Sequence, residues 1–265
     1  MNEKVGNVLD PVEIDRLRQA ATLLLEARRT LEPIDELPAE LRPSSLEAAY
    51  LIQDEMAIAL GTVGGFKVGA PSPTAIPTFA PMPLMGGFAQ NGMLVKSTFH
   101  RLRGIEGEIA FLLGSDLPPR STPYSREEVA AAIASCHPAI EILESGFEDP
   151  DKIDHLSMIG DLQMHGGFGF GAAVDGWQQV DFAQLTATMS VDGVLRVEGT
   201  ASNSAGTDLL RLVTWLANQA HSRTGGLEAG DWITTGSWTG KIFVEPGSQV
   251  TARFADFGTL SLYFE

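Results

Sequence analysis

Apolar positions near the start of the chain recur at helical spacing and predict a first helix. Asp10, Pro11 and Glu13 are typical of a helix start, because Asp caps free amide groups, Pro fits the first turn and Glu can bond back to the cap. One apolar helical face then comprises Leu17, Ala21, Leu24 and Leu25. We expect a proline-rich connector over residues 30–43 to follow this helix.

A second helix is predicted after the connector. Ser44 and Glu47 have the spacing of a capping box, and Gly61 is a stop signal. The apolar stripe of this helix comprises Leu46, Ala49, Tyr50, Met56, Ala57 and Leu60. We therefore expect residues 1–62 to form an N-terminal helical subdomain, which is too small to be stable alone.

From Gly64 onward, short apolar runs broken by Gly and Pro predict strands joined by tight turns. Strands are expected at residues 64–70, 105–113, 139–143, 167–172, 185–191, 194–197, 232–235, 241–244, 250–254 and 260–264. Two helices, at 125–135 and 207–223, are expected to interrupt them. Helices at the front and mostly strands behind predict an α+β fold, with residues 63–265 as the second domain.

The charge balance narrows the class of partners. The 265 residues include 18 Lys and Arg against 34 Asp and Glu, which gives a formal net charge of −16. Without a cluster of basic residues, this acidity disfavours nucleic acid and anionic membranes as partners. An acidic protein that turns over small anions would need a local cation, and a metal ion is one candidate.

The chain carries no sign of export or membrane insertion. Cys136 is the only cysteine, so an intrachain disulfide is excluded. Residues 1–10 lack the apolar core of a signal peptide, and no segment approaches the roughly 18 apolar residues of a membrane span. We expect a cytoplasmic protein with no membrane partner.

Two carboxylates share one face of the strand predicted at 105–113. Alternation along a strand places Glu106 and Glu108 on the same side as Ala110 and Leu112. Buried carboxylates at this spacing, about 7 Å, repel strongly unless one is protonated or both bind a cation. Oxygen ligands suit Mg²⁺ or Mn²⁺. A strand on the sheet surface, with both side chains in water, is the alternative.

A third carboxylate, Glu141, lies in the middle of the apolar strand predicted at 139–143, where strand propensity alone does not favour an acid. If this strand is a neighbour of strand 105–113, Glu106, Glu108 and Glu141 offer three oxygens to one octahedral ion. Positions for water and substrate would remain open on that ion. Glu144, just past the strand, is a weaker candidate for the same role.

Three further side chains are candidates for chemistry. Lys67 stands alone in a Gly-flanked apolar stretch and could pair with a substrate carboxylate or an enolate oxygen, although an exposed strand lysine is the alternative. His165 lies close to Asp161 in a Gly-rich stretch, and a structural or surface histidine is the alternative there.

The Gly-bounded loop at residues 234–241 could hold a substrate carboxylate through Thr235, Gly236 and Ser237, with a plain hairpin turn as the alternative. Covalent hydrolase chemistry has no support, because the sequence contains no G-x-S-x-G motif and no motif surrounds Cys136.

The order of these motifs resembles the fumarylacetoacetate hydrolase superfamily, and more narrowly its 2-keto-4-pentenoate hydratase and 4-oxalocrotonate decarboxylase branch. The resemblance runs from about residue 12 to the end of the chain. It rests on Gly-Phe-Lys67-Val-Gly, Ile-Glu106-Gly-Glu108-Ile-Ala-Phe, Pro-Ala-Ile-Glu141-Ile, Asp161, Trp215-Leu-Ala-Asn218 and Leu-x-Ala-Gly230-Asp231-x-Ile-x-Thr-Gly236.

This resemblance implies a mixed β-roll with N-terminal helices, and Mg²⁺ or Mn²⁺ bound by Glu106, Glu108 and Glu141. It implies that Lys67 is the active-site lysine, and that the substrate is a 2-oxo or 2-hydroxydienoate acid which chelates the metal. The implied activity is hydration of an acid such as 2-hydroxypenta-2,4-dienoate in the breakdown of aromatic compounds, with Asp161 positioning the base or water.

Other reactions of the superfamily are alternatives: decarboxylation of a 4-oxalocrotonate-like acid, keto-enol tautomerisation, or C–C hydrolysis. The resemblance also implies a homo-oligomer and, within this branch, association with a partner enzyme of the same pathway. The chain departs from the branch pattern at Leu162 and Met164, where relatives carry polar residues. A non-catalytic homologue that supports a partner enzyme is therefore a further alternative.

Overall fold

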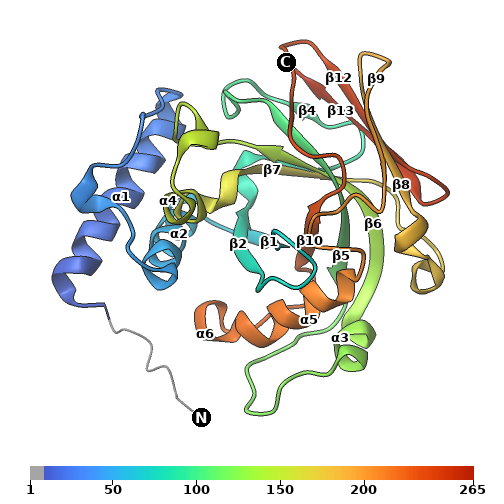
Figure 1. The fold of residues 1–265 in the computed structure, drawn as a ribbon, viewed down its shortest axis with the longest axis horizontal. Coiled ribbons are helices and arrows are strands. Elements are labelled where there is room, and N and C mark those ends of the chain that lie inside the picture. Colours follow the sequence, from blue (N-terminus) through green and yellow to red (C-terminus); the bar gives the residue numbers. More distant parts are fainter. Residues whose placement is uncertain (1–8) are drawn as a thin grey trace.

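A computed structural model describes residues 9–265, in which a pair of N-terminal helices lies beside two β-sheets (Figure 1). The helices are α1 (Pro11–Thr30), α2 (Leu46–Leu60), α3 (Arg126–Ala132), α4 (His155–Gly160), α5 (Leu209–Gln219) and α6 (His221–Thr224). Residues 1–8, part of the segment in which the sequence predicts no signal peptide, lie outside the described residues. Of the helices described here, none is long and apolar enough to cross a membrane.

The capping residue predicted for α1 is confirmed, whereas the one predicted for α2 is displaced by one residue. The Asp10 side chain accepts a hydrogen bond from the Glu13 amide at 2.9 Å, which confirms the predicted start of α1. The cap of α2 is Ser45, which accepts from the Ala48 amide at 3.1 Å, so the prediction of Ser44 is wrong. Ser45 has the extended backbone that precedes a helix, and the first helical residue is therefore Leu46.

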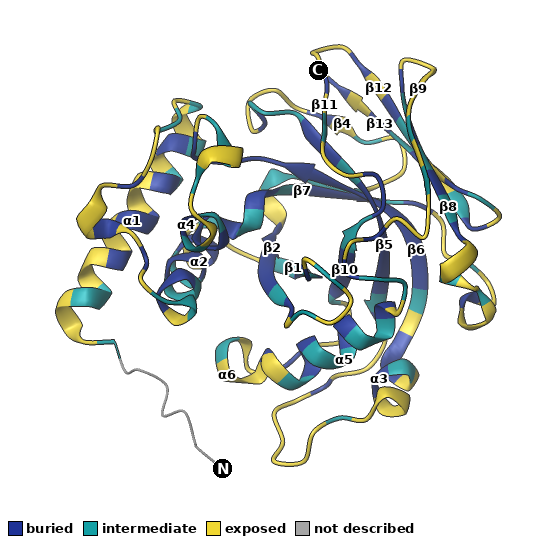
Figure 2. Ribbon diagram, in the orientation of Figure 1, coloured by how far each residue is buried: buried dark blue, intermediate teal, exposed yellow. Residues whose placement is uncertain are grey.

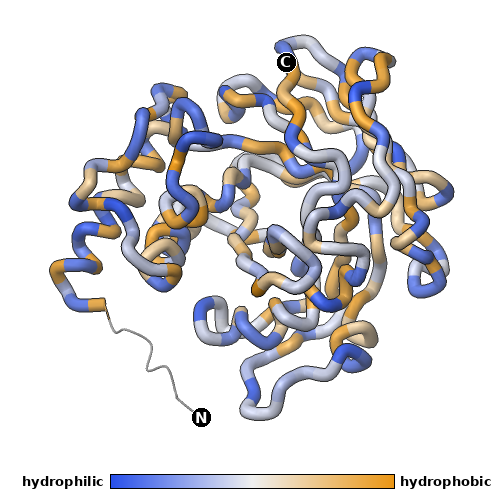
Figure 3. Tube along the Cα trace, viewed as in Figure 1, coloured by the Kyte–Doolittle hydropathy of each residue, from blue (hydrophilic) through white to orange (hydrophobic). Residues whose placement is uncertain are grey.

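The apolar faces of α1 and α2 pack together as a cluster of their own. Hydrophilic and hydrophobic residues alternate along these helices (Figure 3), as expected where one face is buried. Phe147 and Leu162, from the later part of the chain, complete this cluster. The domain boundary at residue 62 stays a prediction.

The larger sheet has eight strands, ordered β2-β1-β10-β5-β6-β7-β3, with β11 also paired to β5. Its strands are β1 (Val63–Gly69), β2 (Thr78–Pro83), β3 (Phe88–Gln90), β5 (Gly104–Leu113), β6 (Ile133–Leu143), β7 (His165–Phe170), β10 (Trp232–Ser237) and β11 (Ile242–Phe243). The long strands β5 and β6 form its centre and are buried along most of their length (Figure 2).

The smaller sheet has five strands in the order β4-β13-β12-β8-β9. Its strands are β4 (Leu94–Val95), β8 (Thr186–Val191), β9 (Val194–Thr200), β12 (Gln249–Phe254) and β13 (Gly258–Phe264). Side chains of the two sheets meet in one core, to which β5 contributes Ile105 and Ile109 and the smaller sheet contributes Phe254 and Leu262. The mixture of helices and two sheets confirms the predicted α+β class.

Two predicted helices end differently in the structure, and three strands, β2, β3 and β4, were not predicted. The helix expected at 125–135 ends at Ala132, because Ile133 already pairs with β5. The helix expected at 207–223 is divided into α5 and α6. Strand β2 contains two prolines and lies at the sheet edge, where a strand tolerates missing amide donors.

Candidate metal centre

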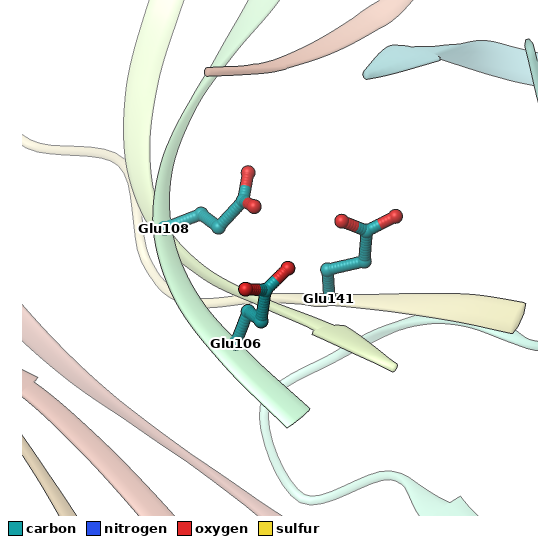
Figure 4. A group of neighbouring side chains, drawn as sticks. All are labelled: Glu106, Glu108 and Glu141. Carbon is teal, nitrogen blue, oxygen red and sulfur yellow. The ribbon is translucent and has the colours of Figure 1, made fainter. Parts of the chain in front are cut away.

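Glu106, Glu108 and Glu141 come together on neighbouring strands. The antiparallel pairing of β5 with β6 places Glu106 directly opposite Glu141, which confirms the predicted adjacency of the two strands. Oxygen atoms of the three carboxylates all lie within 4.8 Å of one another. Figure 4 shows the three side chains on one side of the ribbon, with their carboxylates grouped.

Glu108 and Glu141 are buried and Glu106 is partly buried, so the alternative of a strand with both acids in water is wrong. Glu108 is 1% exposed and Glu141 is fully buried. Ile105 and Ile109, on the opposite face of β5, belong to the core between the sheets. The alternation predicted from the sequence therefore separates an apolar face from a face that carries the acids.

The electrostatics of the cluster call for a cation. Burial and the charges of the neighbouring carboxylates raise the pKa of Glu108 to about 8, and burial also raises the pKa of Glu106. Burial opposes ionisation of Glu141 as well, but Lys67 and His165 outweigh it and lower that pKa. If all three acids are ionised, Lys67 neutralises one of them. A divalent ion with a preference for oxygen ligands, such as Mg²⁺ or Mn²⁺, would balance the other two charges, so this donor set fits such an ion.

Lys67 lies on the same face of the sheet and faces the cluster. Its Nζ is 2.7 Å from Glu141 Oε2 and donates to the Gln163 carbonyl at 2.9 Å. Its side chain is only 13% exposed, so the alternative of an exposed strand lysine is wrong. Three carboxylates raise its pKa although burial acts in the opposite direction, so the side chain is held as an ammonium group.

The carbonyl that holds Lys67 belongs to a strained turn. Leu162, Gln163 and Met164 have φ of 54°, 50° and 65°, the left-handed region that L-residues disfavour by roughly 1–2 kcal/mol each. Leu162 and Met164, the residues that depart from the branch pattern, are both buried. Strain of this kind is concentrated at functional sites.

His165 is part of the cluster from the β7 side. Its Nδ1 lies 2.9 Å from Glu141 Oε1, and the side chain is buried, so a surface histidine is excluded. Burial lowers its pKa, although Glu141 acts in the opposite direction. Among the described residues its Nε2 has no hydrogen-bond partner. His165 therefore orients a carboxylate of the cluster and keeps one ring nitrogen free.

Asp161 is buried outside the carboxylate cluster. Its carboxylate accepts from Arg28 Nε at 2.7 Å, from the Ser145 hydroxyl at 2.5 Å and from the Gly146 amide at 2.9 Å. These donors hold it beside the left-handed turn, and its predicted role in positioning a base or water stays a prediction.

Arg28 is a central residue that the sequence reasoning missed. Besides Asp161, its guanidinium donates to the carbonyls of Glu144 and His165, at 2.9 and 2.7 Å. It therefore ties α1 to the segment that carries His165. The signal was available, because Arg28 lies one helical turn after the buried Leu24, on the apolar face of α1.

The predicted loop contributes to the site through Gly236, which was expected, and through Thr234, which was not, while a role of the loop in substrate binding stays a prediction. The Thr235 hydroxyl donates to the Ile109 carbonyl at 2.7 Å, so it is not free for a substrate. Instead the Thr234 hydroxyl and the Gly236 amide donate to Glu108, the amide at 3.1 Å. Strand alternation was the missed signal, because Thr234 faces Ala110 and so shares the side of Glu108.

Two uncharged residues, Ser237 in the loop and Asn203 outside it, complete this part of the site. Ser237 faces Glu108 in the strand register, and its buried hydroxyl has no partner among the described residues. Asn203, which the sequence reasoning missed, donates to the carbonyls of Thr235 and Gly236 at 2.9 and 3.0 Å and so holds the turn.

Glu144, the weaker candidate for a metal ligand, has another role. Its oxygens accept hydrogen bonds from the backbone amides of Arg101, Leu102 and Ser145. Glu144 therefore secures the loop before β5, and the three acids on β5 and β6 remain the ligand candidates.

Comparison with known proteins places this arrangement in a family. The model for the C-terminal domain of fumarylacetoacetate (FAA) hydrolase matches residues 89–263. A 4-oxalocrotonate decarboxylase of Pseudomonas putida is 28% identical over 160 residues, which span 60% of this chain and 59% of that protein. The TodF product hydratase of P. putida is 28% identical over 275 residues, which span 97% of this chain and 98% of that protein.

Solved structures share the fold over almost the whole chain. The 4-oxalocrotonate decarboxylase from P. putida G7, complexed with magnesium and adipate, superposes with a TM-score of 0.81 at 24% identity. The match covers 97% of this chain and 99% of that one. At this identity the likeness establishes the fold, including the N-terminal helices.

Proposed function

This chain belongs to the fumarylacetoacetate hydrolase family, and on that premise we propose that it is a metal-dependent lyase of the hydratase type. The proposed reaction adds water to a 2-hydroxydienoate or 2-oxo-enoate acid such as 2-hydroxypenta-2,4-dienoate. Relatives named as a decarboxylase and as hydratases support the lyase class. We place the protein in the cytoplasmic breakdown of aromatic compounds, as a homo-oligomer that also associates with a partner enzyme of its pathway.

One observation carries the proposal: three carboxylates from two adjacent strands, two of them buried and one partly buried, lie together with a lysine ammonium 2.7 Å from one of them. Glu106, Glu108 and Glu141 would hold Mg²⁺ or Mn²⁺. When bound, the ion would polarise the carboxylate and 2-oxygen of the substrate and offset negative charge that develops there. The magnesium in a solved structure of the same fold supports this choice.

The side chains of the site fit the proton transfers that hydration requires. The dienol ketonises to a conjugated 2-oxo-enoate, and water then adds at C4. Lys67, held by Glu141 and the Gln163 carbonyl, offers its ammonium to the 2-oxygen, where enolate charge accumulates. His165 is kept neutral by burial, and its Nδ1 faces Glu141, so its free Nε2 can accept a proton from water.

Decarboxylation of a 4-oxalocrotonate-like acid is the second candidate, and the left-handed turn favours it. Leu162 and Met164 are buried apolar side chains at positions where the resemblance to the hydratase and decarboxylase branch implies polar ones. An apolar wall gives fewer hydrogen bonds to a reacting water, whereas loss of CO₂ needs none. The same Lys67 would stabilise the enolate in either reaction.

The experiment is an ultraviolet assay of purified protein with 2-hydroxypenta-2,4-dienoate and with 4-oxalocrotonate, with and without Mg²⁺ or Mn²⁺, followed by mass analysis of the products. Metal-dependent gain of the mass of one water supports the hydratase. Loss of the mass of CO₂ would replace it with the decarboxylase.

Matched variants connect the result to the site. Glu106→Gln keeps the shape of the ligand but removes its charge, and we expect it to abolish both Mg²⁺ binding and turnover. Glu148→Gln, at an exposed glutamate paired only with Arg101, serves as the control and should change neither. Tight metal binding without turnover of either acid would favour the non-catalytic homologue.

A further inference from the structure

A second lysine, Lys241, lies beside the carboxylate cluster and is more exposed than Lys67. Strand β11 pairs with β5 through Ile242 opposite Ile105 and Phe243 opposite Gly104. One step further along this antiparallel ladder places Lys241 next to Glu106. Because Ile242 and Ile105 both pack into the core, Lys241 belongs to the opposite face, which is the face of the carboxylates.

The electrostatics of Glu106 agree with this placement. Burial is the largest influence on the pKa of Glu106 and raises it, whereas the positive charges of Lys67 and Lys241 both act to lower it. Both lysines are therefore close enough to the cluster to act on the same carboxylate. Lys67 approaches from β1, which is separated from β5 by β10. Lys241 approaches from β11, which pairs with the same edge of β5 as β10, because β6 occupies the other edge.

The two lysines differ in how firmly they are held. Lys67 is 13% exposed, and its partner Glu141 is fully buried. Lys241 is 34% exposed, and its partner is Asp151, which is 67% exposed on the short helical turn η3 (Pro150–Lys152). Exposed ion pairs contribute little net stability, so another carboxylate can replace Asp151 at low cost.

The positive charge of Lys241 is not needed to neutralise the three glutamates of the proposed site. A divalent ion and Lys67 together neutralise the three glutamates, and the ion also attracts the carboxylate of a 2-oxo acid. Lys241 is then an additional cation on the carboxylate face, and its side chain is more exposed than that of Lys67. A second carboxylate is the substrate group that matches it.

We propose that Lys241 binds a carboxylate at the far end of the substrate, so that the natural substrate is a 2-oxo or 2-hydroxydienoate diacid. This inference rests on the proposed function and narrows its substrate class. It also bears on the choice of reaction. Loss of CO₂ from that end would break the bond to the carboxylate carbon and send its electron pair to the 2-oxygen. The charge that Lys241 holds would then disappear, so Lys241 stabilises the starting diacid and favours water addition.

The test compares two ligands that differ only at the far end. Both 2-oxoadipate and 2-oxohexanoate have the same 2-oxo acid head, but the second ends in a methyl group. Their binding to the full chain with Mg²⁺ is measured by calorimetry, which needs no turnover. We expect the diacid to bind about tenfold more tightly, because a charge-assisted hydrogen bond is added.

Three variants assign the difference to one side chain. Lys241→Met should remove the preference for the diacid and leave the affinity for 2-oxohexanoate within about twofold. Lys152→Met, at a lysine that is 81% exposed and paired with Asp149, should leave the preference intact. Asp151→Asn releases Lys241 from its partner and should strengthen diacid binding severalfold.

Equal affinities for the two ligands in the unaltered chain, or an unchanged preference in Lys241→Met, overturn the inference. The two proposals fail separately. If Lys241→Met removes a diacid preference but neither dienoate is turned over, the inference on ligand class stands and the proposed reaction fails. If dienoates are hydrated but the diacid preference is absent, the proposed reaction stands and this inference fails.

Discussion

Arg28 provides the sharpest test of how the N-terminal helices support the site. Its side chain reaches from α1 to the carboxylate of Asp161 and to the carbonyls of Asp161, Glu144 and His165, with four hydrogen bonds of 2.7–2.9 Å. The Arg28 side chain is 11% exposed and the Asp161 side chain is fully buried. Arg28→Met keeps most of the apolar stem and removes all four donors.

The expected cost follows from the burial of the partner. Removal of one member of a buried ion pair costs about 3–5 kcal/mol, because the remaining charge is left in a low-dielectric environment. Asp161 keeps its bonds from Ser145 and Gly146, which places the expected loss at the lower end of that range. The double variant Arg28→Met/Asp161→Asn should lose less than the sum of the two single variants, since the unpaired charge is gone.

The neighbouring Arg29 is a matched control. It lies on the same helix, is 70% exposed and pairs only with Glu26, so Arg29→Met should cost no more than about 1 kcal/mol. Urea unfolding of the metal-free proteins at neutral pH, followed by both tryptophan fluorescence and circular dichroism, measures the difference. If Arg28→Met and Arg29→Met lose the same unfolding free energy within error, the structural role assigned to Arg28 is refuted.

Three further predictions concern the acids and their partners. In the metal-free protein, the pKa of Glu108 is about 8 in the folded state and has its ordinary value of 4.5 in the unfolded chain. Between these two pH values the folded state binds one more proton, so the unfolding free energy should fall as pH rises through this interval. Glu108→Gln should remove that decline, and identical urea curves for both proteins across the interval would contradict the assigned pKa. Thr234→Val should weaken Mg²⁺ binding by about tenfold, whereas Thr235→Val should not, and calorimetry that finds equal effects would reject the assignment of Thr234. Glu144→Gln should lower the unfolding free energy by about 1–3 kcal/mol while Mg²⁺ still binds, and lost Mg²⁺ binding would return Glu144 to the ligand set.

The sequence by itself determined the features that depend on neighbours along the chain. Helical spacing and a cap at Asp10 predicted α1, because a helix buries one face every turn and leaves its first amides free. Strand alternation placed Glu106 and Glu108 on one face, and an acid inside an apolar strand marked Glu141. These patterns are local, so they can be read without knowledge of what packs against them.

Only the tertiary structure decided which groups meet. The register that sets Glu106 opposite Glu141, and Lys241 beside Glu106, depends on pairing between segments that are far apart in the chain. The carbonyl of Gln163 that holds Lys67 belongs to a left-handed turn that no side-chain pattern predicts. Arg28 finds its acceptors more than a hundred residues away. Such contacts result from the packing of whole elements, and local propensity carries no information about their partners.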